Sequence, residues 1–155
     1  MRHLLIIVLS LVLFSCKKDT FTSAPILTFE KFSTNNVTSQ VTLNNDPKLT
    51  VRITDKEGDI GFNAGKDTSR IYIKNLVSGR FDSTMFLPNL SNVTTKTFRA
   101  DVEISLFNVL GGRITNPMPR RPYTDTLYFE VYTKDFAGNK SNVLKTPEPF
   151  IYTTL

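Results

Sequence analysis

Apolar and polar residues alternate with a period of two along most of the chain after residue 25. The alternation is clearest in residues 49–53, 70–74, 98–106 and 127–132, and weaker in residues 26–32, 37–43, 80–87 and 141–153. A period of two is typical of antiparallel strands that bury one face and leave the other wet. Since no window of a dozen residues sustains a helical stripe, the pattern predicts an all-β fold.

Turn residues separate these segments into about 7–8 short strands, a number that fits a two-sheet antiparallel sandwich. Pro147 and Pro149 fall in the last segment, so we expect that segment to be an edge strand or to be broken there. The single cysteine excludes an internal disulfide, and a chain of this length can bury a sufficient core without one.

The N-terminus has a different composition. Arg2 and His3 precede an apolar stretch over residues 4–14, which is too short to span a bilayer because a spanning helix needs about 20 residues. The following Leu-Phe-Ser-Cys, which ends at Cys16, resembles a bacterial lipobox. The resemblance implies that residues 1–15 are a lipoprotein signal peptide, cleaved before a lipidated Cys16. Residues 16–25 then form a tether to a domain over residues 26–155. The alternative is an uncleaved core helix with a buried cysteine.

Two motifs carry a further resemblance. An alternating strand runs into Asp55-Lys-Glu-Gly-Asp-Ile-Gly, and Asp135-Phe-Ala-Gly-Asn-Lys-Ser-Asn follows near the C-terminus. Together with the lipobox, they resemble a family of small envelope lipoproteins from Bacteroidetes, which is largely of unknown function. The resemblance implies an immunoglobulin-like β-sandwich in the cell envelope, anchored by lipid to the outer membrane on its periplasmic or its surface face.

The first motif is a candidate metal site. Asp55, Glu57 and Asp59 place three carboxylates within five residues, and oxygen-rich loops of this spacing suit Ca²⁺. Asp135 and Asn139 of the second motif would add oxygen ligands if the two turns lie at the same end of the sandwich. The alternative is that these side chains cap backbone N–H groups in ordinary turns. Calcium is therefore a possible cofactor, and no other cofactor is indicated.

The segment 108–124 is rich in glycine, proline and arginine and is a candidate binding loop. The candidate ligand-binding residues are Arg113, Arg120, Arg121 and Tyr123, with the outward-facing Tyr128 and Tyr132, whose rings could stack on a sugar. The alternative is a solvated loop that crosses between the sheets, and the absence of tryptophan weakens the sugar hypothesis.

The composition argues against an enzyme. Without the signal peptide the chain has no histidine, so it cannot build a Ser-His-Asp unit or a His-containing zinc site. Its basic balance, +5 at pH 7, does not indicate nucleic-acid binding, because lysines and acids are interspersed. We expect a lipid-anchored binding or accessory module without catalytic activity, whose partner is a protein or a glycan. The alternatives are a glycan-binding lipoprotein of a polysaccharide-uptake system or, further away, a hydrolase using carboxylates such as Asp101 and Glu103.

Overall fold

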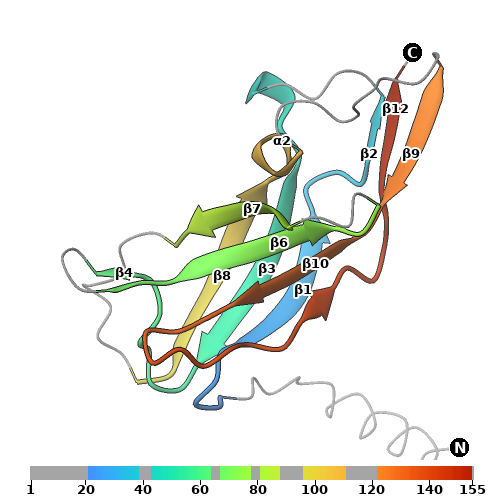
Figure 1. Ribbon diagram of the computed structural model, residues 1–155. Helices are drawn as coiled ribbons and strands as arrows, with labels where there is room; N and C mark the ends of the chain where they lie inside the picture. The colour runs from blue at the N-terminus through green and yellow to red at the C-terminus, as the bar shows by residue number, and fades with distance from the viewer. Residues whose placement is uncertain are drawn as a thin grey trace, which may run out of the picture.

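A computed structural model describes residues 21–38, 43–63, 67–77, 81–87, 96–110 and 122–154. Two antiparallel sheets face each other, and a smaller third sheet extends from one end of them (Figure 1). The predicted all-β sandwich is therefore confirmed. The predicted signal peptide, Cys16, Arg113, Arg120 and Arg121 lie outside the described residues.

The first sheet has the strand order β1-β3-β8. It consists of β1 (Ile26–Phe32), β3 (Lys48–Asp55) and β8 (Phe98–Ser105). The central strand β3 pairs along its whole length with β8, from Lys48 opposite Ser105 to Asp55 opposite Phe98. Leu49, Val51 and Ile53 are fully buried, as their alternation predicts.

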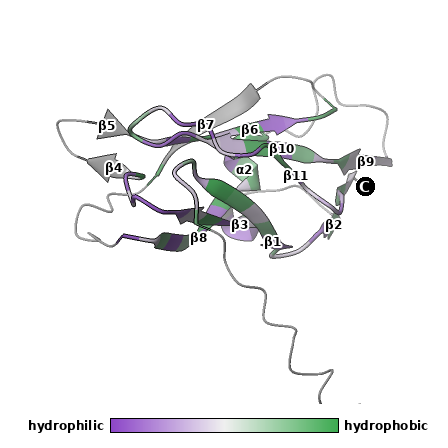
Figure 2. Ribbon diagram, turned by 90° about the horizontal axis from the view of Figure 1, so that it is seen from below, coloured by the Kyte–Doolittle hydropathy of each residue, from purple (hydrophilic) through white to green (hydrophobic). Residues whose placement is uncertain are grey.

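The second sheet has the order β11-β10-β6-β7 and packs against the first. It consists of β6 (Arg70–Asn75), β7 (Phe81–Phe86), β10 (Phe129–Thr133) and β11 (Leu144–Lys145). Val131 lies opposite Ile73, and both side chains are fully buried. Figure 2 shows the two layers from below, with β8, β3 and β1 in one and β6, β10 and β11 in the other.

The third sheet, β2-β12-β9, joins β2 (Asn36–Thr38), β9 (Tyr123–Leu127) and β12 (Phe150–Thr154). β12 lies in the middle, parallel to β2 and antiparallel to β9. The remaining elements are short: β4 (Phe62–Asn63) paired with β5 (Asp67–Thr68), the 3₁₀ turn η2 (Leu43–Asn45) and the helix α2 (Leu106–Val109).

One hydrophobic core runs through all three sheets. Phe32 of the first sheet has its ring centroid 6.4 Å from that of Phe129 in the second and 6.0 Å from that of Phe150 in the third. Helix α2 adds Leu106 and Val109 to the same cluster. No helix among the described residues is long and apolar enough to cross a membrane.

One strand prediction is wrong in its extent, and another is confirmed. The alternation over residues 127–132 predicts one strand, but the chain changes sheets at Tyr128, between β9 and β10. Leu127, Phe129 and Val131 remain buried across the change, because the alternation records which side chains face the core and not which strand is the neighbour. The weaker segment 141–153 forms β11 and β12, separated around Pro147 and Pro149, as the two prolines predict.

The sandwich has two distinct ends. At one end, which we call the base, β3 finishes at Asp55 and β1 begins at Ile26, opposite Thr54. Residues 21–25, which lead into β1, lie at this end (Figure 1). At the other, the distal end, Tyr123 of β9 pairs with Thr154 of β12.

Candidate functional site

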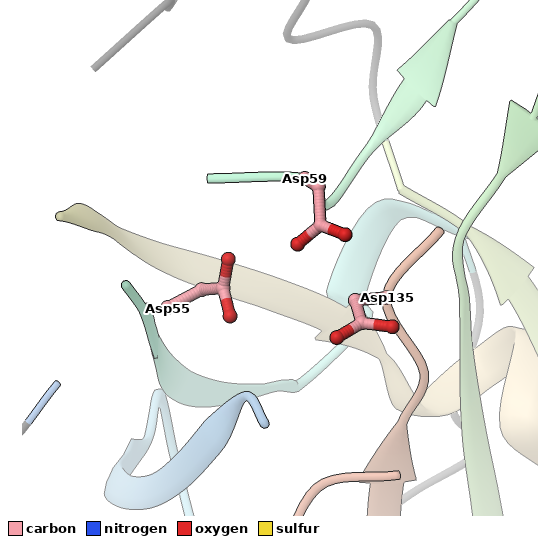
Figure 3. A group of neighbouring side chains, drawn as sticks. All are labelled: Asp55, Asp59 and Asp135. Carbon is pink, nitrogen blue, oxygen red and sulfur yellow. The ribbon is translucent and has the colours of Figure 1, made fainter. Parts of the chain in front are cut away.

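Three aspartates meet at the base of the sandwich. One carboxylate oxygen from each of Asp55, Asp59 and Asp135 lies within 4.8 Å of the other two. Figure 3 shows the three side chains pointing toward one another. Asp55 is completely buried, Asp135 is 5% exposed and Asp59 is half-buried. Like charges so close and so far from water repel one another unless a cation or protons compensate them.

The first two aspartates belong to the turn that follows β3. Asp55 is the last residue of the strand, and its Oδ2 accepts a 2.7 Å hydrogen bond from the backbone N–H of Gly58. Gly58 has φ 70°, a left-handed conformation that glycine adopts without strain. This tight turn brings the carboxylate of Asp59 close to that of Asp55.

The third aspartate comes from the second motif, in the turn after β10. Asp135 Oδ1 accepts from the backbone N–H of Asn139 at 2.7 Å, and Oδ2 accepts from the Asn139 Nδ2 amide at 2.8 Å. The backbone N–H of Phe136 donates to the carbonyl of Asp59 at 2.8 Å, which joins the two turns directly. The two motifs, about eighty residues apart in the sequence, thus form one structural unit at the base.

Burial and charge both act on Asp55. Burial is the largest influence and raises its pKa to about 6, the Gly58 N–H lowers it, and the carboxylates of Asp59, Glu57 and Asp135 raise it. The Oδ1 atoms of Asp55 and Asp59 are buried and have no hydrogen-bond partner among the residues that the structure describes. A buried acceptor without a donor is destabilising, so these two atoms mark an incomplete polar site.

Of the two other candidate calcium ligands, Glu57 lies outside the cluster of three aspartates and Asn139 contacts one of its members. Glu57 is exposed, and its Oε1 accepts a 3.0 Å hydrogen bond from the Ser23 hydroxyl, in the segment that leads into β1. Asn139 is exposed and holds Asp135 through both its backbone and its side-chain N–H groups. Asp55 and Asp135 thus make the capping hydrogen bonds that the alternative hypothesis requires, and both remain members of the acidic cluster.

The candidate binding tyrosines are spread over two sheets. Tyr123 begins β9, whereas Tyr132 lies in β10, where its ring stacks on Tyr72 with centroids 4.6 Å apart and the planes 8° from parallel. The Lys140 ammonium lies 4.1 Å from the Tyr132 ring centroid. Tyr128, between the two strands, has the Lys145 ammonium 5.7 Å from its ring. The Tyr132 ring is thus already in contact with another ring and with a cation.

Asp101 and Glu103, the carboxylates considered for hydrolysis, lie on β8 and are not part of the acidic cluster at the base. Arg52 binds Asp101 through two hydrogen bonds, of 2.8 and 3.0 Å, and also forms an ion pair with Glu30. The hydrogen bonds from Arg52 hold the pKa of Asp101 below its ordinary value. A general acid needs a raised pKa, so the lowered pKa of Asp101 is unsuited to that role.

The sequence analysis did not identify the function of Asn142, the last residue of the second motif. Its Oδ1 accepts from the Leu27 N–H at 2.7 Å, and its Nδ2 donates to the Leu27 carbonyl at 2.9 Å. An asparagine side chain can serve both backbone groups of an edge strand, because its amide carries a donor and an acceptor side by side. Asn142 therefore ties β1 to the segment that precedes β11. The only signal in the sequence is its place at the end of the motif.

We expect Asn142→Ala to lower the free energy of unfolding by about 1–2 kcal/mol, because two hydrogen bonds are lost and each contributes about 0.5–1.5 kcal/mol. Urea unfolding followed by circular dichroism measures the change. Asn108→Ala is the control, since Asn108 is exposed in α2 and should change stability by less than about 0.5 kcal/mol. An equal loss in the two variants would contradict the structural importance of the Asn142 contacts.

Comparison of the chain with protein-family models, with curated proteins and with solved structures finds no match.

Proposed function

We propose that the chain is a lipid-anchored, non-catalytic module of the bacterial cell envelope, held at the outer membrane by Cys16, with an immunoglobulin-like sandwich that binds or supports a protein or a glycan. The packing of β1-β3-β8 against β11-β10-β6-β7 supports the immunoglobulin-like part of this proposal, because the chain passes repeatedly between two facing antiparallel sheets. The lipobox-like residues 13–16 support the anchor.

The observation that carries the proposal is the place where the tether joins the sandwich. The backbone N–H of Lys56 donates to the Thr22 carbonyl at 3.1 Å, and Ser23 donates to Glu57 at 3.0 Å. These contacts hold the entering chain against the base. Thr22 lies six positions after Cys16, and an extended chain of that length spans at most about 22 Å. A lipidated Cys16 would keep the base within that distance of the membrane and leave the distal end facing a partner.

The geometry favours a general binding module over a dedicated glycan receptor. A sugar stacks on an aromatic ring whose face is open, and Tyr132 already contacts Tyr72 and Lys140. Tyr123, at the distal end, lies in a different sheet from Tyr132. The tyrosines therefore do not supply one continuous stacking platform.

Cys16→Ala is expected to abolish lipidation and to leave an unlipidated precursor, because the chain contains no other cysteine. Metabolic labelling with radioactive palmitate measures the first effect, and the size of the protein on a gel measures the second. Ser15→Ala is the matched control, because it keeps a small residue before the cysteine and should stay labelled. Labelling that persists in Cys16→Ala would rule out the anchor.

A further inference from the structure

We propose that Asp55, Asp59 and Asp135 form a Ca²⁺ site at the base of the sandwich. The site goes beyond the proposed function and does not depend on the lipid anchor, since all its ligands lie within the folded domain. It joins the turn after β3, in one sheet, to the turn after β10, in the other.

The acidic cluster is more than a group of surface carboxylates. Asp55 is completely buried, its carboxylate points toward the other two aspartates (Figure 3), and its Oδ1 has no hydrogen-bond partner among the described residues. The Oδ1 of Asp59 is also buried and also has no hydrogen-bond partner among the described residues. The capping hydrogen bond of Asp55 uses the other oxygen, Oδ2, so capping does not account for either Oδ1. A cation between the carboxylates would satisfy both atoms.

No side-chain cation of the described structure takes this place. None of the ion pairs found among the described residues involves any of the three aspartates. Lys56 is in the same turn, but its side chain is exposed. Asp135 can accept a cation in addition to its contacts with Asn139, because each carboxylate oxygen has two lone pairs and each receives one hydrogen bond. All three side chains are thus available as ligands.

The spacing and the chemistry of the ligands favour Ca²⁺. The three oxygens lie within 4.8 Å of one another. Calcium lies about 2.3–2.6 Å from its ligands, so oxygens across the ion are up to about 5 Å apart. Magnesium demands a near-ideal octahedron and usually keeps several of its waters, so a set of protein carboxylates suits it less well. A purely carboxylate set is also unsuited to zinc, which prefers nitrogen and sulfur.

A bound ion would stabilise the point at which the tether enters. Lys56, whose backbone N–H donates to the Thr22 carbonyl of the tether, lies in the sequence between Asp55 and Asp59. The Phe136 N–H to Asp59 carbonyl bond already joins that turn to the second one. Calcium would therefore bind the two sheets and the entering segment into one rigid base.

The test is thermal unfolding of the full-length chain in detergent, followed by circular dichroism, with 1 mM CaCl₂ or in metal-depleted buffer. At a hundredfold excess over Kd we expect Ca²⁺ to raise the midpoint by about 5–10 °C. Magnesium at the same concentration should give a clearly smaller shift. Calorimetric titration of the folded chain should give one Ca²⁺ per molecule. A midpoint that does not respond to Ca²⁺, together with no heat of binding, overturns the site. An equal response to magnesium overturns the assignment to Ca²⁺.

Two matched variants locate the ion. Asp59→Asn keeps the shape of the side chain but removes its charge, and it should lose the Ca²⁺-dependent shift while the metal-free midpoint is kept. Glu57→Gln removes the same charge two residues away, from a side chain that contacts Ser23 instead, and should retain the full shift. A shift that survives in Asp59→Asn, or one that disappears equally in Glu57→Gln, contradicts the assignment. A circular dichroism spectrum of each variant establishes that it has folded.

Discussion

Phe129→Ala is expected to lower the free energy of unfolding by about 3–5 kcal/mol, because it removes a completely buried aromatic ring and leaves a cavity. Phe129 begins β10, and its ring lies beside that of Phe32, which in turn contacts Phe150. These three rings come from the three different sheets. The substitution therefore removes contacts between sheets as well as apolar area, and the neighbours cannot close the gap without shifting strands.

Urea unfolding measures this loss, and Glu103→Ala is its control. Glu103 is exposed on β8, opposite Thr50, and its replacement should change stability by less than about 0.5 kcal/mol. An unchanged dependence on urea concentration would indicate that the denatured state is unaffected. Similar losses in the two variants would mean that the inward and outward faces of these strands are misassigned.

In metal-depleted buffer the folded chain is expected to become less stable as the pH rises from 5 to 7.5. The pKa of Asp55 is about 6 when folded, against an ordinary value of 3.8, so the folded state holds this proton more tightly. That stabilisation is complete below the unfolded value and is lost as the pH rises through about 6. The pKa difference of about two units corresponds to about 3 kcal/mol over the whole titration, at 1.36 kcal/mol per unit. About 1.4 kcal/mol of this remains at pH 5 and is lost by pH 7.5.

Calcium should reverse the sign of this dependence, because the ion binds ionised carboxylates and protons compete with it. The measurement is the urea midpoint at several pH values, with and without 1 mM CaCl₂. Asp55→Asn is the control: it still offers an oxygen to the Gly58 N–H but cannot titrate, so the metal-free slope should flatten. Asp46 and Asp101, whose pKa values are lowered, affect stability only at more acidic pH. A metal-free midpoint that rises steadily from pH 5 to 7.5 would contradict the prediction.

Much of the fold could be predicted because alternation directly reports which face of a strand is buried. Leu49, Val51 and Ile53 face the core as predicted, and so does Ile104 on β8. The change of sheet at Tyr128 could not be predicted, because the same alternation continues across it. Pairing partners depend on distant strands, and a local period does not carry that information.

The sequence indicates where the acidic cluster lies, but not which of the acidic side chains come together in it. Asp55, Glu57 and Asp59 look equivalent in the sequence, since each is an acid in one short turn. The turn conformation separates them: it directs Asp59 to Asp135 and leaves Glu57 with Ser23. That choice depends on the left-handed backbone at Gly58 and on the Phe136 N–H to Asp59 carbonyl bond, and the second of these links distant parts of the chain. Spacing alone does not specify such contacts.

The central position of β12 in the third sheet has a consequence for how the protein folds. Its register with β2 sets Tyr152 opposite Val37, and Asn142 holds Leu27 across 115 residues of sequence. The sandwich cannot be completed until the last strand is available, and such long-range pairing makes folding slow. We therefore expect an emerging chain to stay extended until its C-terminal residues are released. A chain that must cross a membrane unfolded before it reaches its final compartment would benefit from that delay.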